Sequence, residues 1–261
     1  MDDSNKASSS SKNKIVPGKK GNALQLTGDD GVNLGVGNFK RTQPFSVALW
    51  MNTPHHKERT VVFSRSKAWT DAGSRGYQML LRDGHLSTSL IHFWPGNAIN
   101  IRTTAKLPKN EWHHVTITYD GSTHAGGLAI YVDGKPAETE IHKDNLYKNI
   151  TGGGNDHIVI GQRFRDVGFA KGLVDDFRVF DRELTAAEVA QLHDGQTLAK
   201  LLAKPVDALD QAERLALRAY YLATANEPNA QQLAKLRAAR EKVTQLLDDK
   251  TENMVMEQMK V

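Results

Sequence analysis

Short runs of β-branched and aromatic residues, separated by turn-forming residues, fill the chain between Ala23 and Phe180. Runs of this kind are typical of β-strands bounded by turns, and no helical periodicity interrupts them. The expected strands cover residues 23–26, 32–34, 45–51, 60–64, 77–82, 85–91, 98–104, 113–119, 127–132, 157–160 and 172–180. A long series of strands without intervening helices excludes a βαβ arrangement and predicts an antiparallel sandwich or barrel.

Two Asp-Gly pairs support the antiparallel pairing. Asp83-Gly84 and Asp133-Gly134 each stand between strand-like flanks. Both residue types tolerate the positive φ angles of a tight hairpin turn, so each pair predicts a β-hairpin.

The pattern changes to helix at Leu184. Thr185 can cap a helix start and Glu188 can reach back to it, which is a capping box, while Leu184 and Val189 form a hydrophobic staple. Two longer helices are expected over residues 211–225 and 230–248, separated by Asn-Glu-Pro-Asn. We expect these two to form an antiparallel hairpin that docks on the sandwich or on a neighbouring domain, with a solvated charged face.

The first 20 residues are expected to be a tail, either disordered or added in cloning, because a Ser-, Lys- and Asn-rich tract opens the chain. The expected organisation is therefore a tail (1–20), a β-sandwich (21–183), a helical region (184–252) and a further segment (253–261).

Composition limits the classes of partner that this chain is expected to bind. The formal net charge is +4 in 261 residues, and the cations form no basic stripe, so a nucleic-acid partner is not expected. No apolar run approaches the roughly 20 residues that cross a bilayer, so membrane insertion is not expected either, and no export signal is visible. Cysteine is absent.

Several motifs resemble the laminin-G-like domains of the concanavalin A-like lectin and glucanase superfamily. The segments that carry the resemblance are residues 21–28, 45–50, 111–121, 130–135 and 172–189. The resemblance implies an all-β, concanavalin-like antiparallel jelly roll, here followed by the helical hairpin.

A closer resemblance involves His92 to Ile99, Ala219 to Leu222, and the terminal sequence Met-Val-Met-Glu-Gln-Met. These look like the laminin-G-like insert of large bacterial multidomain proteins that also carry a c-type cytochrome domain. The resemblance implies that residues 253–261 begin a following domain, truncated here, and that the parent protein is extracytoplasmic (periplasm or cell surface) and handles polysaccharide. No Cys-x-x-Cys-His haem motif occurs, so no haem is expected in this segment.

Catalysis is not expected. The retaining glucanases that this fold resembles carry the pattern Glu-x-Asp-x-x-Glu on one strand, and it supplies the two carboxylates that flank the scissile bond. This sequence lacks the pattern. Adjacent histidines such as His113 and His114 point to opposite faces of a strand, which argues against a shared metal ion.

Carbohydrate binding needs flat aromatic faces beside planar polar groups. Trp50 and Trp112 lie in apolar strand patterns and are assigned to packing, whereas Trp69 and Trp94 lie in polar loops. Each loop tryptophan is either a ligand platform or a plug buried under its own loop. The polar neighbours expected to complete the ligand site are His92, Asn97, Arg75 and Arg102.

A structural calcium ion is predicted near Asp175. Strict alternation would place this acid on the apolar face with Leu173, Phe177 and Val179, where a carboxylate needs a partner. Calcium-binding relatives carry a similar closing strand, and their pattern implies that Asp29 and Asp30 complete the site. The alternative is that Asp175 accepts backbone N–H bonds or pairs with an arginine.

Two functions fit these observations. The first is a non-catalytic module that recognises a polysaccharide or surface glycan. The second is a structural spacer or protein-interaction domain that contacts neighbouring domains and binds no small ligand.

Overall fold

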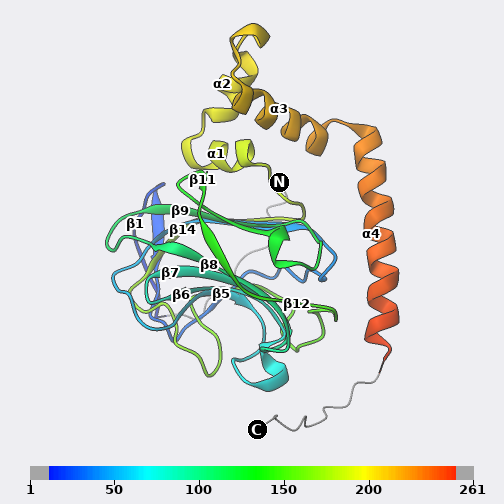
Figure 1. Ribbon diagram of the computed structural model, residues 1–261. Coiled ribbons are helices and arrows are strands. Elements are labelled where there is room, and N and C mark those ends of the chain that lie inside the picture. The colour runs from blue at the N-terminus through cyan, green and yellow to red at the C-terminus, as the bar shows by residue number, and fades with distance from the viewer. Residues whose placement is uncertain (1–11, 251–261) are drawn as a thin grey trace, which may run out of the picture.

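The structure, a computed structural model, describes residues 12–250 and consists of two stacked antiparallel sheets with helices at one end and one side (Figure 1). The first sheet has the order β1 (Lys14–Pro17), β2 (Asn22–Gln25), β14 (Leu173–Phe180), β4 (Phe45–Asn52), β9 (His113–Tyr119), β10 (Leu128–Val132) and β11 (Lys135–Pro136). The second has the order β12 (Thr139–Asn145), β8 (Asn97–Lys106), β7 (His85–Phe93), β6 (Gly76–Arg82), β5 (Thr60–Arg65), β13 (Val159–Ile160) and β3 (Val32–Asn33). The predicted concanavalin-like sandwich is confirmed.

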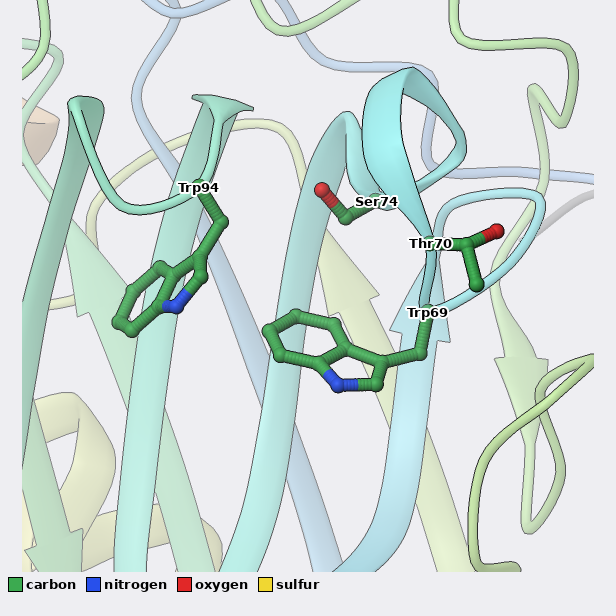
Figure 2. A pocket seen from close by; sticks show the side chains of 4 residues that line it. All are labelled: Trp69, Thr70, Ser74 and Trp94. Carbon is green, nitrogen blue, oxygen red and sulfur yellow. The ribbon is translucent and has the colours of Figure 1, made fainter.

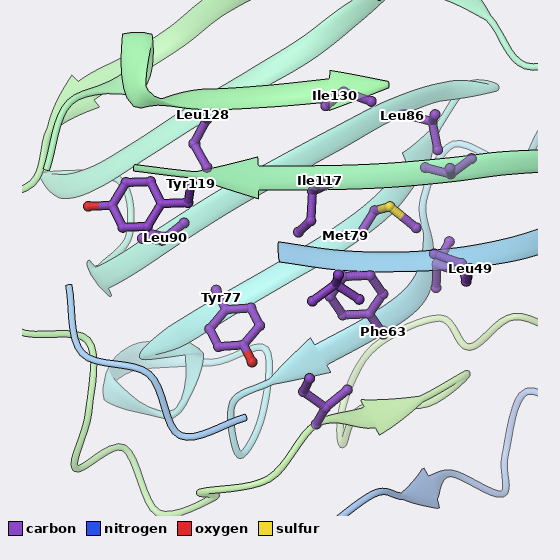
Figure 3. Packing of buried hydrophobic residues seen from close by; sticks show 14 of the residues in the cluster. Leu49, Phe63, Tyr77, Met79, Leu86, Leu90, Ile117, Tyr119, Leu128 and Ile130 are labelled. Carbon is purple, nitrogen blue, oxygen red and sulfur yellow. The ribbon is translucent and has the colours of Figure 1, made fainter. Parts of the chain in front are cut away.

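The core lies between the two sheets (Figure 3). Because successive strand side chains alternate between faces, Val115, Ile117 and Tyr119 of β9 all point inward, as predicted. They meet residues of the second sheet such as Phe63 and Met79, which are fully buried. Burial of apolar surface on this scale is the main stabilising contribution to a fold of this kind.

Both predicted hairpin turns are confirmed. Asp83 and Gly84 have φ angles of 52° and 89°, and Asp133 and Gly134 have 51° and 77°. Positive φ at both central residues is the geometry that matches the twist of paired strands.

A β-bulge in β14 corrects the predicted orientation of Asp175. The register against β4 shifts between Asp175 and Arg178, and Asp176 takes a φ of 45°. Val174 and Phe177 therefore both face the core. Asp175 stands opposite Trp50 in the register of β14 and β4, on the outer face of the sheet. Strict alternation failed here because the sequence does not reveal the extra residue.

Part of the expected tail belongs to the sheet, which is a second correction. β1 pairs with β2 along its whole length, from Lys14 opposite Gln25 to Pro17 opposite Asn22. This strand lies at the sheet edge, is mostly exposed and is held by backbone pairing. It therefore lacks the alternation of apolar and polar residues by which a strand is recognised in a sequence. Residues 1–11 lie outside the described residues.

Helix α1 (Ala186–Asp194) begins with the predicted capping box between Thr185 and Glu188. It covers the outer face of the first sheet, where the Trp50 and His193 ring centres are 5.4 Å apart. Trp50 is thus buried beneath α1 and lies outside the core between the sheets, and Trp112 is partly exposed. The assignment of Trp112 to the core was wrong, because its position just before β9 leaves it at the sheet end.

The remaining helices differ from the expected hairpin. They are α2 (Thr197–Ala203), α3 (Gln211–Thr224) and α4 (Glu227–Asp248), with short 3-10 turns η1 (Asp71–Ser74), η2 (Ala125–Gly127) and η3 (Val206–Ala208). In Figure 1, α3 runs across the end of the sandwich and α4 turns away from it to run down one side.

The C-terminal half of α4 binds the sandwich, which explains why it does not fold back on α3. Glu241 accepts hydrogen bonds from Lys40 Nζ (2.7 Å) and Thr42 Oγ1 (2.8 Å), and Thr244 Oγ1 accepts one from Arg41 Nε (3.1 Å). Apolar residues Leu233 and Leu236 remain exposed. Among residues 12–250, no helix is long and apolar enough to cross a membrane.

Candidate functional site

Trp69 and Trp94 come together on the outer face of the second sheet. Trp94 lies in the turn between β7 and β8, and Trp69 lies in the loop after β5. Their ring centres are 6.0 Å apart and the rings are tilted by 53°. Figure 2 shows both indoles in front of the strands, with the ring of Trp69 extending toward Trp94.

One face of Trp69 is already covered. The guanidinium carbons of Arg59 and Arg163 lie 3.9 Å and 5.0 Å from its ring centre. Cation–π contacts of this kind are attractive and hold the indole in place. Trp69 therefore forms a fixed wall, and part of its surface is used for packing.

Asp166 holds both arginines. Its carboxylate accepts from Arg59 Nε (2.6 Å) and Arg59 Nη2 (3.0 Å), and from Arg163 Nε (3.0 Å). Burial raises the pKa of Asp166, but the hydrogen bonds from Arg59 and the charge of Arg163 outweigh it, so the pKa is below its ordinary value. Burial lowers the pKa of Arg163 to about 10, and the group stays charged at neutral pH.

Trp94 lines two pockets. The first is formed with Trp69, Thr70 and Ser74. The second runs across β6, β7, β8 and β12 and is formed with Arg82, Ser87, Asn100, Arg102, His142 and Lys143. We call the two pockets together the Trp94 groove.

The floor of the groove is polar and buried. Asn100 Nδ2 lies 2.9 Å from Ser87 Oγ and 2.8 Å from Ser89 Oγ, and donates to these hydroxyls.

Of the four predicted polar neighbours, only Arg102 is among the described residues that line the Trp94 groove. Asn97 is buried at the start of β8, where its Oδ1 accepts from the backbone N–H of Tyr147 at 3.0 Å. It positions the segment after β12 and does not face the groove.

His92 and Arg75 form a separate pocket together with Lys148, Asn149, Thr151 and Asp248. Nδ1 of His92 lies 2.5 Å from the Asn149 carbonyl oxygen and Nε2 lies 3.3 Å from Arg75 Nη2. A carbonyl only accepts and a guanidinium only donates, so the ring is neutral with the proton on Nδ1. Burial lowers the pKa of His92, in agreement with this state.

The predicted calcium ligands do not converge. Asp175 Oδ2 accepts from the backbone N–H of Lys20 at 2.7 Å, beyond the C-terminal end of β1. Asp30 Oδ2 accepts from the Lys12 N–H at 3.2 Å, at the other end of that strand, and Asp29 precedes it. Among residues 12–250, no group of three or more His, Asp or Glu side chains could hold a metal ion. Asp175 thus matches the alternative of a backbone hydrogen bond.

The sequence did not point to seven of the groove residues: Thr70, Ser74, Arg82, Ser87, Asn100, His142 and Lys143. A usable signal existed for Asn100, because it stands between Ile99 and Ile101 on a correctly predicted strand and so takes the face opposite to theirs. For His142 and Lys143 no such signal exists, since β12 is exposed almost throughout.

The fold and the groove define a jelly-roll domain of the concanavalin type with a tryptophan-lined groove on one sheet. Residues 26–190 match the model of the Laminin_G_3 family, described as the concanavalin A-like lectin/glucanases superfamily, and the chain belongs to this family. A comparison with curated protein sequences finds no match.

Solved structures share the fold at low sequence identity. The binding domain of Paraclostridial Mosquitocidal Protein 1 is similar with a TM-score of 0.57 and 17% identity, over 73% of this chain and 47% of that one. The Botulinum Neurotoxin serotype G binding domain gives a TM-score of 0.53 and 17% identity, over 74% of this chain and 47% of that one. The chain thus spans about half the length of these structures.

Proposed function

We propose that this domain is a non-catalytic module that binds a polysaccharide or surface glycan in the Trp94 groove. The observation that carries the proposal is the position of Trp94, a partly exposed indole that lines both a pocket shared with Trp69 and a pocket of polar and charged residues. Aromatic faces stack on the C–H faces of sugars, and adjoining polar groups bind the hydroxyls. The domain would hold a larger extracytoplasmic protein close to its glycan.

Two further features support a binding role. No carboxylate occurs among the described residues that line the Trp94 groove, whereas glycoside hydrolysis ordinarily needs two across the scissile bond. Solved structures with this fold include domains named as binding domains.

A glycan array tests the proposal. We expect the wild-type chain to bind a defined group of glycans, and Trp94→Ala to lose most of that signal. Phe93→Ala is the matched control, because Phe93 is the adjacent exposed aromatic residue and does not line the groove among the described residues. Binding that survives Trp94→Ala, or an array with no binding at all, would contradict the proposal.

The alternative is an interaction domain or spacer without a small ligand. It is favoured by the exposed apolar residues of α4, which no described segment covers: Leu233, Leu236, Val243 and Leu246. Unpartnered apolar side chains in a row suit contact with a neighbouring domain. An array without binding, combined with self-association or partner binding lost on Leu236→Lys, would favour this alternative.

A further inference from the structure

Three cations line the pocket of the Trp94 groove that lies away from Trp69. Arg82 ends β6, Arg102 lies in β8 and Lys143 lies in β12. None of the three side chains forms a salt bridge or hydrogen bond with any residue of the described range 12–250. Arg163, which is buried and packed against Trp69, is instead paired with Asp166.

The acid opposite Arg102 in the sheet is not paired with it. Glu140 lies opposite Arg102 in the register of β12 and β8. Its carboxylate forms no salt bridge with Arg102 among the described contacts, and Oε2 lies 3.8 Å from His142 Nε2. Three cations therefore line the pocket and no carboxylate does among its described lining residues, which favours a positive potential there.

The same pocket has the other requirements of a sugar site. The Trp94 indole borders it on one side, and Ser87 and Asn100 form its buried floor. Guanidinium groups bind carboxylate and sulfate oxygens through paired N–H donors, and such charge-assisted hydrogen bonds are stronger than neutral ones. A neutral sugar offers these cations hydroxyl acceptors but no opposite charge.

From this arrangement we infer that the groove selects an acidic glycan, with a uronic acid carboxylate or a sulfate ester held by Arg82, Arg102 and Lys143 while the sugar ring stacks on Trp94. The inference rests on the proposed function. Because these charges are close to solvent, salt screens the attraction, and affinity is expected to fall as ionic strength rises.

The test is an array of acidic glycans, each beside its neutral partner of the same backbone. Suitable pairs are polygalacturonate and its methyl ester, alginate and carboxyl-reduced alginate, and chondroitin sulfate and desulfated, carboxyl-reduced chondroitin. We expect at least one acidic member to bind about tenfold or more tightly than its partner at low salt, and to weaken in 0.5 M NaCl.

Three variants complete the test. Arg102→Gln should remove most of the preference for the acidic member, and Glu140→Gln should increase it by taking away the competing carboxylate. Lys106→Gln is the matched control, since Lys106 is an exposed cation on the same strand that does not line this pocket among the described residues.

The outcomes separate the two proposals. Equal binding of acidic and neutral partners, lost on Trp94→Ala, overturns the acidic preference and leaves glycan binding intact. An acidic preference that Arg102→Gln and Lys106→Gln reduce equally also overturns the inference, because it would reflect net charge alone. An array without any binding overturns the proposed function and the inference with it.

Discussion

The guanidinium carbon of Arg59 lies 3.9 Å from the ring centre of Trp69, so one face of this indole is already stacked within the protein. Trp94 has no such cation against it among the described contacts. The two tryptophans therefore contribute differently, Trp69 as a fixed wall of the groove and Trp94 as the surface that meets a ligand.

This difference predicts opposite effects of two truncations. Trp69→Ala removes both cation–π contacts and should lower the free energy of unfolding by about 1–2 kcal/mol more than Trp94→Ala does. Trp94→Ala should instead cause the larger loss of glycan affinity. Urea unfolding of both variants measures the first effect, and the reverse order of stabilities would contradict the assignment.

Asp166 is expected to be the most costly single substitution near the groove. Its carboxylate is 1% exposed and binds two arginines, so Asp166→Asn leaves the buried Arg163 and the partly buried Arg59 without their counter-charge. Breaking a buried pair in this way costs about 3–5 kcal/mol. The control is Asp176→Asn, which removes the more exposed pairs with Lys20 and Arg178 and should cost about 1 kcal/mol or less. Chemical denaturation compares the two variants, and similar losses would contradict this view.

His114 should make the fold sensitive to acid. Burial against Trp50, reinforced by the charge of His193, lowers the pKa of His114 from 6.5 to about 4. Below about pH 6.5, His114 therefore binds a proton in the unfolded chain but stays neutral in the folded chain. The stability from this group is complete above that pH and is lost as the pH falls toward 4, by up to about 3 kcal/mol.

Urea unfolding at pH 7 and pH 4.5 measures this loss in the wild type and in His114→Phe, which keeps an aromatic ring against Trp50. The difference between the two pH values should shrink in His114→Phe. It should stay the same in His124→Gln, because the His124 side chain is 74% exposed. An unchanged difference in His114→Phe would assign the acid sensitivity to other groups.

The melting temperature in EDTA tests whether a bound calcium ion contributes to stability. Asp175 accepts a backbone N–H bond from Lys20, and Asp30 lies at the opposite end of β1. We therefore expect EDTA to leave the melting temperature unchanged, and Asp175→Ala to lower stability by about 1–2 kcal/mol through the lost hydrogen bond. A melting temperature that falls in EDTA and recovers with added calcium would support the structural calcium ion instead.

Arg41 should control the attachment of α4. Its side chain is buried and donates to the Leu146 carbonyl (3.0 Å) and to Thr244 Oγ1 (3.1 Å). Arg41→Ala should speed amide hydrogen exchange in the C-terminal half of α4 without changing glycan affinity, because α4 does not line the Trp94 groove among the described residues. Lys40→Ala, which removes an exposed pair with Glu241, should have a smaller effect on exchange.

The sequence predicted the sandwich, its Asp-Gly hairpins and the capping box at Thr185, because each depends on local residue preferences. It missed β12 and misplaced Asp175, since an exposed strand lacks apolar alternation and the bulge at Asp176 leaves no local mark. The pairing of Trp69 with Trp94 could be suggested from their loops. Its geometry depends on Arg59 and Asp166, which are 107 residues apart, and no local pattern links them.

The exposed strand β12 has a consequence for solubility as well as for the groove. It is the free edge of the second sheet, and an unpaired edge invites a strand from another molecule. Charged residues such as Glu140 and Lys143 along this edge, together with the irregular register between Ile141 and Lys143, discourage such pairing. Lys143 would then do two things at once, attracting an acidic glycan into the groove and keeping the sheets of two copies from pairing edge to edge.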